Sequence, residues 1–268
     1  MNSMVRLTRA ELSKVLGRSS GLVGLAVAVL VAVLAVAVVQ LVEVRSGGSF
    51  TQGAGGAAEL IQLDLQSALG GALRGRNFFV LPLVLLMVTG QLIAGEFDDR
   101  TLRAALVRPV RRSTVLAAKI AALGLYAALT LLLTWGTTLV LGLLLLGPEG
   151  LDLLPVTLGF AVSWLSDLGL ILLGAFFSVR LRSVVGVVVG TVLLLMLDKG
   201  LWAALSLLGS VLGEAWALTA VQWLPGTALA AWEGWQTGFE SGPFFGLAGL
   251  LLVGGGLAFH GFARLDVP

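Results

Sequence analysis

Residues 95–119 read GEFDDRTLRAALVRPVRRSTVLAAK, and this segment holds six of the 17 Lys and Arg residues of the chain. It is the only strongly charged stretch of a 268-residue protein in which 57% of the residues are hydrophobic and 12% are charged. Apolar runs long enough to cross a bilayer precede and follow it. The segment is therefore expected to be a charged loop between two transmembrane helices.

The rest of the chain predicts a polytopic membrane protein of the all-α class. Soluble domains have about a quarter of their residues charged, so this chain is too apolar to be a soluble domain. Windows of about 20 apolar residues indicate transmembrane helices. The strands of a membrane barrel would alternate apolar and polar residues, and these runs do not. Six spans are predicted, at residues 22–42, 78–94, 120–146, 154–179, 184–205 and 244–262.

The distribution of positive charge predicts the orientation. If the N-terminus lies in the cytoplasm, all but four of the 17 basic residues fall on the cytoplasmic side, as the positive-inside rule requires. The residues assigned to the outer side are Arg45, Arg74, Arg76 and Lys199. Both termini and the charged loop are therefore expected in the cytoplasm. The excess of Arg over Lys, with abundant Ala, Gly, Val and Leu, indicates a bacterium with a GC-rich genome. The expected location is the bacterial cytoplasmic (inner) membrane.

The N-terminal residues 4–18 are expected to form an amphipathic helix before the first span. At 100° per residue, Val5, Leu12, Val15 and Leu16 fall on one arc. This pattern suits a helix that lies in the cytoplasmic interface, and it suits a simple positive-inside anchor equally well.

Two outer segments are expected to hold short extracytoplasmic helices. One helix is predicted at residues 57–69, between the first two spans. Residues 206–242 are predicted to form interfacial or re-entrant helices, because Trp prefers the membrane–water boundary. The Trp residues of that segment are Trp216, Trp223, Trp232 and Trp235.

The order of charges within the loop favours a short helix. Glu96, Asp98 and Asp99 come first and basic residues follow, which is the order that the helix macrodipole prefers. Pro109 would stop or kink this helix before the chain re-enters the membrane. By charge alone, an ordinary loop that only sets the topology is an equal alternative.

The same loop resembles the one after the second helix in ATP-binding-cassette (ABC) exporter permeases of the type 2 superfamily. Their pattern is Gly-Glu, Thr-Leu five residues after the Glu, then Pro, a nearby Arg, and Lys before the third span. Here it falls on Gly95, Glu96, Thr101, Leu102, Pro109, Arg112 and Lys119. The spacing is also similar to that of the permease associated with nitrous-oxide reductase maturation. Arg100 departs from the family, which usually has Gly before Thr-Leu.

The resemblance implies one transmembrane permease domain over residues 1–268 that pairs with a second copy as a homodimer. Each copy would rest on a separate ABC ATPase subunit, and residues 96–113 would form the coupling helix that docks on it. The expected contact residues are Glu96, Arg100, Thr101, Leu102, Arg108, Pro109 and Arg112. The sequence has no G-x-x-x-x-G-K-[ST] phosphate loop. ATP and Mg would therefore bind the partner ATPase, and this chain is expected to be non-catalytic, with no cofactor and no nucleic-acid partner.

Export of a substrate is the expected function, and two alternatives stay open. The subunit would otherwise pass ATP-driven motion to an extracytoplasmic partner docked on the outer Trp segment, without transporting a solute. An intramembrane enzyme would need paired carboxylates, a Ser-His arrangement or clustered metal ligands. The chain has one clear intramembrane acid, one distant His260 and no Cys, so no metal site is predicted.

Asp167 is the intramembrane acid. An acid near the centre of a spanning helix costs about 2.5–3.5 kcal/mol on insertion scales, so Asp167 is expected to face protein or a wet cavity. It is interpreted either as a polar point on a translocation path or proton-linked switch, or as the partner of a Ser or Thr such as Thr137. In the fifth span, Asp198 and Lys199 predict either a local ion pair or the outer end of the helix.

Overall fold

The computed structural model describes residues 3–46, 50–52, 59–61, 64–98, 111–148, 151–211, 213–235 and 241–264. Within these ranges, six helices are long and apolar enough to cross a membrane, which confirms the predicted number of spans and the helical class. They are α2 (Ser19–Ser46), α4 (Val80–Ile93) continued by α5 (Gly95–Asp98), α7 (Arg112–Leu145), α8 (Leu153–Leu181), α9 (Val184–Val211) and α12 (Ser241–Ala263).

Shorter elements complete the fold. They are α1 (Ser3–Gly17), α3 (Leu65–Phe78), α10 (Ala215–Val221), α11 (Pro225–Leu229), the 3-10 helix η1 (Ala231–Trp235), and the strands β1 (Phe50–Gln52) and β2 (Glu59–Ile61). The strands pair antiparallel, with Phe50 opposite Ile61. The helix predicted at residues 57–69 is therefore wrong in its first half. It begins only at Leu65, because the Asp64 carboxylate accepts a 2.8 Å hydrogen bond from the Ser67 N–H and caps the helix there.

The second span is preceded directly by α3, which extends beyond the helix predicted at residues 57–69. Helices α3 and α4 follow each other with one break at Phe79, where the backbone has φ −160° and ψ −48°. Pro82 accounts for the break, because its ring would clash with the carbonyl of Phe78 in a continuous helix. Arg74 and Arg76, which were assigned to an outer loop, therefore lie within a helix that packs on α7 and α8.

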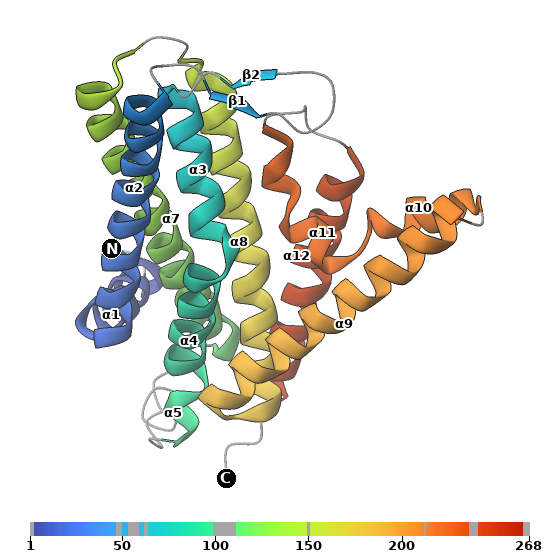
Figure 1. The fold of residues 1–268 in the computed structure, drawn as a ribbon. Coiled ribbons are helices and arrows are strands. Elements are labelled where there is room, and N and C mark those ends of the chain that lie inside the picture. Colours follow the sequence, from blue (N-terminus) through green and yellow to red (C-terminus); the bar gives the residue numbers. More distant parts are fainter. Residues whose placement is uncertain are drawn as a thin grey trace.

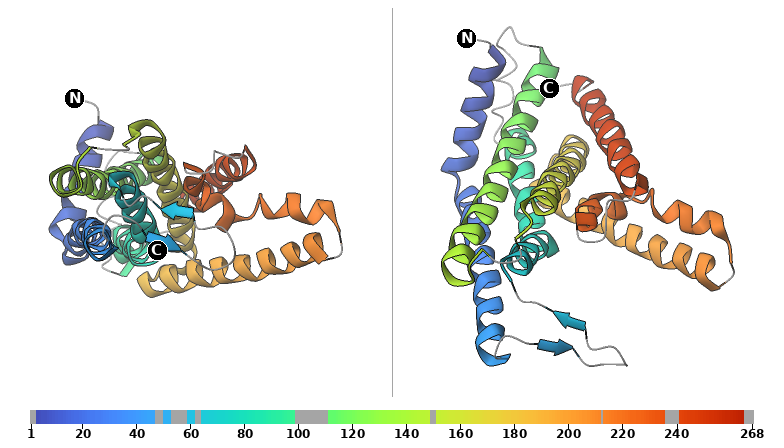
Figure 2. Two further views of the ribbon diagram at one scale, coloured as in Figure 1. Left: turned by 45° about the horizontal axis from the view of Figure 1, so that its top comes forward. Right: turned by 90° about the horizontal axis from the view of Figure 1, so that it is seen from above.

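Helix α8 is the centre of the bundle. It packs against α4, α7, α9 and α12, and its Ile171 and Ala175 are fully buried in the main apolar core. Helix α1 packs against α7, and Leu12, Val15 and Leu16 of its apolar arc join the same core. Helix α9 diverges from the bundle, and α10 folds back against it (Figures 1 and 2). The apolar outer face of α9 is therefore left exposed.

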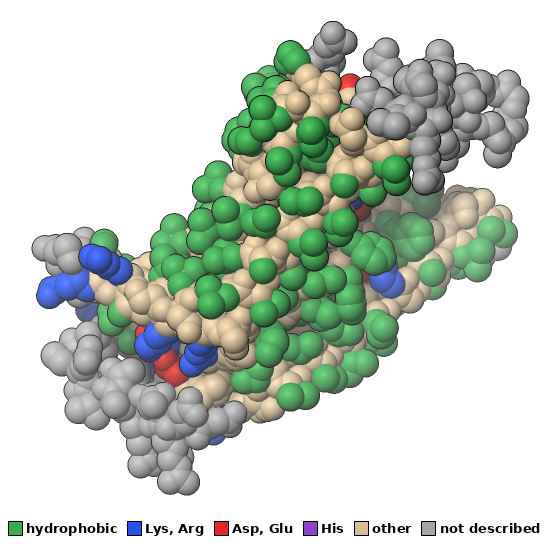
Figure 3. Space-filling view, turned by 60° about the vertical axis from the view of Figure 1, so that its left-hand side comes forward, with side chains coloured by type: hydrophobic (Ala, Val, Ile, Leu, Met, Phe, Trp, Pro, Cys, Tyr) green, Lys and Arg blue, Asp and Glu red, His purple; other side chains and the backbone are tan. Residues whose placement is uncertain are grey.

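Charged and apolar side chains are separated on the surface. On the face in Figure 3, most of the Lys, Arg, Asp and Glu side chains gather at one end, and apolar side chains cover the middle. The 34-residue α7 reaches into the charged end. A helix of this length is about 50 Å long, and the hydrocarbon core of a bilayer is about 30 Å thick. Its first turns thus have the length to extend beyond the apolar layer.

Candidate functional site

The flanking helices hold the two ends of the charged loop. The chain leaves α4 through α5, whose four residues include Glu96 and Phe97, and it becomes helical again at Arg112, the first residue of α7. The remaining predicted contact residues, Arg100, Thr101, Leu102, Arg108 and Pro109, lie outside the described residues. The described part of the site therefore consists of the two ends of the loop and the residues that contact them.

Four charged residues join these attachments to α1, and we call them the loop-anchor cluster: Glu11, Lys14, Glu96 and Lys119. The ammonium nitrogen of Lys119 lies 3.0 Å from Glu11 Oε2 and 2.7 Å from Glu96 Oε1. It also donates a 3.1 Å hydrogen bond to the carbonyl of Leu92 in α4. One buried ammonium thus connects α7 with α1, α4 and α5.

Lys14 is the half-exposed member of the cluster and contacts both carboxylates. Its ammonium nitrogen lies 2.9 Å from Glu11 Oε1 and 3.0 Å from Glu96 Oε1. Partial burial opposes the charge on Lys14, but hydrogen bonds to Glu11 and Glu96 outweigh burial, and the pKa of Lys14 is raised above its ordinary value. Two carboxylates and two ammonium groups therefore balance each other at the start of the loop.

Burial makes this balance important for stability. The side chains of Lys119 and Glu96 are 1% and 8% exposed, whereas that of Lys14 is 47% exposed. An unpaired buried ion costs several kcal/mol, so Lys119 is tolerated because both carboxylates surround it. Glu96 Oε2 is buried without a hydrogen-bond partner among the described residues. The cluster consequently has one unsatisfied acceptor directly at the start of the loop.

The short connection between α8 and α9 contacts Phe97 in α5, at the start of the charged loop. Arg182 caps the C-terminus of α8 with a left-handed backbone, φ 51°, and its N–H donates to the Ser178 carbonyl at 3.1 Å. Its guanidinium carbon lies 5.6 Å from the centre of the Phe97 ring, within cation–π range. The segment that begins the loop is therefore held by α1, by α7 and by the end of α8.

A second polar group lies inside the bundle, where Arg76 of α3 pairs with Asp167 of α8. The distances are 2.6 Å from Arg76 Nη2 to Asp167 Oδ2 and 3.3 Å from Nη1 to Oδ1, so the contact is bidentate. Thr130 of α7 accepts from Nη2 at 3.1 Å, and Asn77 accepts from Nη1 at 2.6 Å. The expected partner Thr137 was wrong: the interhelical partner of Asp167 is an arginine.

The comparison with protein families decides the class of the chain. The family described as ABC-2 family transporter protein matches residues 7–198, which is more than half of the sequence. The chain is a member of this family. It is thus the transmembrane subunit of an ABC transporter, a multi-pass membrane permease. None of the curated proteins compared with it matches. The finer resemblance to the nitrous-oxide-reductase maturation permease stays a prediction.

The match covers the loop-anchor cluster, the charged loop and the Arg76–Asp167 pair of the permease. Of the seven predicted ATPase contacts, only Glu96 and Arg112 are described. Glu96 is turned toward Lys14 and Lys119, and Arg112 is exposed at the start of α7. Contact of these residues with an ATPase stays a prediction.

The predicted outer Trp residues of the permease differ in their surroundings. Trp216 on α10 is exposed, and Trp223 is exposed while its ring stacks on Phe245 with the ring centres 6.4 Å apart. Trp232 is buried in an apolar cluster with Leu247 and does not present its ring to the surface. Trp235 ends η1, and its side chain is not described.

The prediction for Asp198 and Lys199 was wrong in both of its forms. Helix α9 continues past them to Val211, so the span does not end there. No ion pair joins the two side chains in the described part of the chain. Instead, Asp198 Oδ2 accepts a 3.0 Å hydrogen bond from the N–H of Gly226 in α11. Asp198 therefore fixes α11 against α9.

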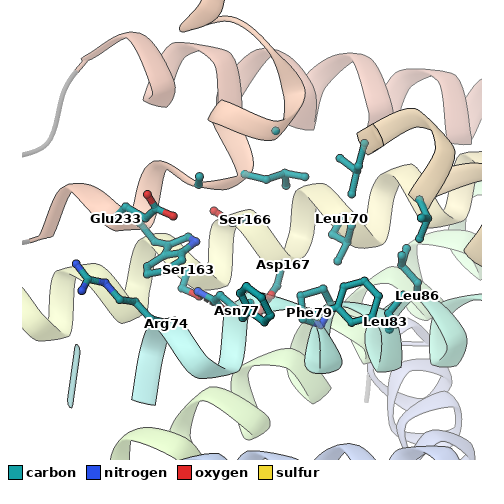
Figure 4. Close-up of a pocket in the computed structure, with 18 of the residues that line it drawn as sticks. Arg74, Asn77, Phe79, Leu83, Leu86, Ser163, Ser166, Asp167, Leu170 and Glu233 are labelled. Atoms are coloured by element: carbon teal, nitrogen blue, oxygen red, sulfur yellow. Dashed lines mark hydrogen bonds between the residues drawn. The ribbon is translucent and has the colours of Figure 1, made fainter. Parts of the chain in front are cut away.

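The permease contains a cavity of about 940 Å³ beside the Arg76–Asp167 pair. Its walls come from α3 and α4, from α8, from α9 and from the α11–η1 segment. Asp167 itself lines the cavity, together with Ser163 and Ser166. Figure 4 shows these side chains along α8. Asp167 thus faces protein, through Arg76, and also lines the cavity.

Sequence reasoning missed three residues of these sites: Glu11, Lys14 and Arg76. Lys119 belonged to the loop pattern but had no assigned role. One signal was available, because Glu11 is the only acid in α1 and its charge opposes the basic residues around it. Arg76 carried a weaker signal, because a basic residue at the outer end of a predicted span runs against the positive-inside rule.

Proposed function

We propose that the permease couples ATP hydrolysis by a separate nucleotide-binding subunit to export of a substrate across the bacterial cytoplasmic membrane. It works as a homodimer with both termini in the cytoplasm, and residues 96–113 dock on the ATPase. ATP and Mg bind the ATPase alone. The observation that carries this proposal is the loop-anchor cluster, which attaches Glu96 at the start of the docking loop to two helices, α1 and α7, by ion pairs centred on the buried Lys119.

The cluster supports a specific route for the motion. When the ATPase dimer closes, it moves the loop, and Glu96 transmits the displacement to Lys119 and hence to α7 and α1. A flexible tether would absorb such a displacement. Buried pairs in a packed environment resist it, because separating them would leave uncompensated charges. The helices attached to the loop are therefore expected to move as a unit.

The cavity favours export over a purely mechanical role. Helix α8 forms one wall of the cavity and packs against α4, α7 and α9. A movement of α4 and α7 therefore displaces the cavity wall directly. The Arg76–Asp167 pair, with Thr130, ties α3, α7 and α8 together at the cavity wall. A subunit that only transmitted motion to an outer partner would need no internal space of this size.

Reversal of the loop charges tests the proposal. The double variant Arg108→Glu/Arg112→Glu is purified with its ATPase and reconstituted in vesicles. In this variant, ATP is expected to be hydrolysed at the rate of the ATPase alone, without the change in rate that the wild-type permease causes. The thermal unfolding of the variant is measured beside that of the wild type, so that a loss of coupling is distinguished from a loss of folding.

A matched control reverses two charges elsewhere, in the variant Arg9→Glu/Arg264→Glu. Both residues are exposed and lie outside the loop. This control is expected to keep normal coupling. Wild-type coupling in the Arg108/Arg112 variant would refute the assignment of the loop as the ATPase contact.

A further inference from the structure

We propose that the cavity between α4, α8, α9 and the α11–η1 segment binds a single-chain amphiphile that has an uncharged, hydroxyl-bearing headgroup and enters from the bilayer. This inference deepens the proposed function by naming the chemical class of the cargo, and only the word cargo rests on that function. The cavity belongs to this chain, so binding is testable without an ATPase.

Three helices each present one continuous stripe to the cavity. The lining positions lie within residues 79–86 at α4, 163–170 on α8 and 192–199 on α9. In each range they follow the i, i+3, i+4, i+7 spacing of one helix face. Each stripe extends about 10 Å along its helix axis. An extended chain can therefore follow the walls over their whole length.

Polarity changes along this length. The start of α9 lies beside the end of α4, where Gly90 is close to Val184, so α9 runs opposite to α4 and α8. The lining residues nearest to that end are all apolar, and they are Leu86, Leu170 and Val192. Figure 4 shows Asn77 and Glu233 at the opposite end from Leu86. The shape thus suits a ligand that is apolar at one end and polar at the other.

The apolar end suits a hydrocarbon chain. Water there would find few hydrogen-bond partners, whereas an alkyl chain would bury its own surface and that of the walls. The volume of about 940 Å³ lies at the upper end of the range of about 300–1,000 Å³ that is usual for pockets holding organic ligands. The space is therefore sufficient for a chain together with a headgroup.

The cavity is open at its side, in the middle of a span. Phe79 and Met196 both line it, and they are nevertheless 53% and 67% exposed. Met196 lies near the middle of α9, which diverges from the bundle (Figures 1 and 2). Hydrocarbon surrounds this part of a spanning helix. An amphiphile dissolved in the bilayer therefore reaches the cavity without crossing water.

The cations at the polar end do not require an anionic headgroup. Arg76 is paired with Asp167, and Arg74 has an interaction of its own. The Asp198 carboxylate lies beside Lys199 and interacts electrostatically with its ammonium group. A headgroup without charge therefore suits this end, because it adds no ion that the cavity must compensate.

Two lining groups at the polar end keep hydrogen-bonding capacity. Among the described residues, the Lys199 ammonium group has no hydrogen-bond acceptor and the Glu233 carboxylate has no donor. An ammonium group only donates hydrogen bonds and a carboxylate only accepts them, whereas a hydroxyl group does both. A headgroup with two hydroxyl groups can therefore bind Lys199 and Glu233 without carrying a charge.

Protection of a single cysteine from alkylation tests the inference, because the chain contains no Cys. Along the α9 axis, Leu195 lies about 6 Å and Val192 about 10 Å from Lys199. Leu195→Cys and Val192→Cys, in phosphatidylcholine nanodiscs without ATPase, are each treated with a membrane-permeant maleimide in the presence of an alkyl glycerol ether. Hexyl glycerol ether is expected to protect Leu195→Cys alone, whereas the decyl ether should protect both, because its chain reaches the apolar end. Leu197→Cys, which is exposed and does not line the cavity, is the matched control.

Two further compounds separate the contributions of the headgroup and the chain. Decyltrimethylammonium has the same chain as the decyl ether, but its head has no hydroxyl group, and it is expected to protect less. Adamantanol has a hydroxyl group but no chain, and it should leave Val192→Cys unprotected. If Val192→Cys fails to fold, Leu170→Cys on α8 provides a second position at the apolar end.

The hydrogen bonds to the headgroup are tested by two variants. Adding Lys199→Met or Glu233→Met is each expected to weaken protection by the decyl ether by about tenfold, because a hydrogen bond to a charged group is lost. Glu214→Met is the matched control, since Glu214 is exposed and does not line the cavity. The control should leave protection unchanged.

Three results would overturn the inference: equal protection by decyltrimethylammonium, protection of Val192→Cys that does not depend on chain length, or protection that is unchanged in Lys199→Met and Glu233→Met. The two proposals are separable. Protection without ATP coupling keeps the ligand site and removes the transport role, whereas coupling without protection keeps the transport role and removes this ligand class.

Discussion

The ammonium nitrogen of Lys119 lies 2.7 Å from a carboxylate oxygen of Glu96, although the two residues stand on opposite sides of the charged loop. The contact closes the loop at its base, so α4 with α5 on one side and α7 on the other cannot separate without breaking a buried ion pair. It also brings α1 into the assembly through Glu11. The following predictions concern this cluster, the intramembrane pair and the packing of α9.

Removal of Lys119 should destabilise the permease far more than removal of Lys14. Lys119→Met leaves Glu11 and Glu96 buried with only Lys14 to compensate them, and the expected loss is about 3–5 kcal/mol in the free energy of unfolding. Lys14→Met removes a half-exposed partner and should cost at most about 1 kcal/mol. Thermal unfolding of both variants in nanodiscs measures the difference. Equal losses would contradict the central position of Lys119 in the cluster.

Replacement of both members of the Arg76–Asp167 pair should be milder than replacement of one. Asp167→Leu leaves a buried guanidinium without its counter-ion and is expected to cost about 3–5 kcal/mol. The double variant Arg76→Met/Asp167→Leu removes both charges, so it should recover much of that loss. A double-mutant cycle on the unfolding free energies measures the coupling. Additive losses would show that the two charges stabilise the bundle independently.

The contribution of Lys14 to stability should disappear at high pH. Its folded pKa is raised above the ordinary value of 10.5, so the stabilisation is complete below that pH and is lost as the pH rises through the folded pKa. The difference in unfolding free energy between the wild type and Lys14→Met should therefore be constant up to about pH 10 and decline above it. Arg9→Met is the control, because Arg9 lies on the same helix as Lys14 but outside the loop-anchor cluster. A difference that grows with pH would have the wrong sign.

Gly90 should be required where α4 meets the start of α9. A Cβ at this position would lie 3.3 Å from Val184 Cγ1 and 3.4 Å from the Val184 Cα. Gly90→Leu is therefore expected to push the helices apart and cost about 1–3 kcal/mol. Gly136→Leu on α7 is the matched control, since a Cβ there meets nothing within 4 Å. Comparable unfolding temperatures for both variants would argue against close packing at Gly90.

Local sequence patterns were sufficient for the number of spans and for the family. The predicted spans at residues 154–179 and 244–262 agree within three residues with α8 and α12, because the apolar length of a helix is visible in consecutive residues. The helix predicted at residues 57–69 missed most of α3, which continues to Phe78. That helix is only partly apolar, and Arg74 and Arg76 interrupt the pattern that would have revealed it.

Only the packing of the helices established which charges meet. Glu11 and Lys119 are 108 positions apart, and Arg76 and Asp167 are 91 apart. A single sequence carries no periodic signal over such separations, because the pairing of distant side chains depends on the rotation and crossing of each helix against its neighbours. Amino-acid order thus specifies which segments enter the membrane, and the assembled bundle brings the buried ions and the cavity together.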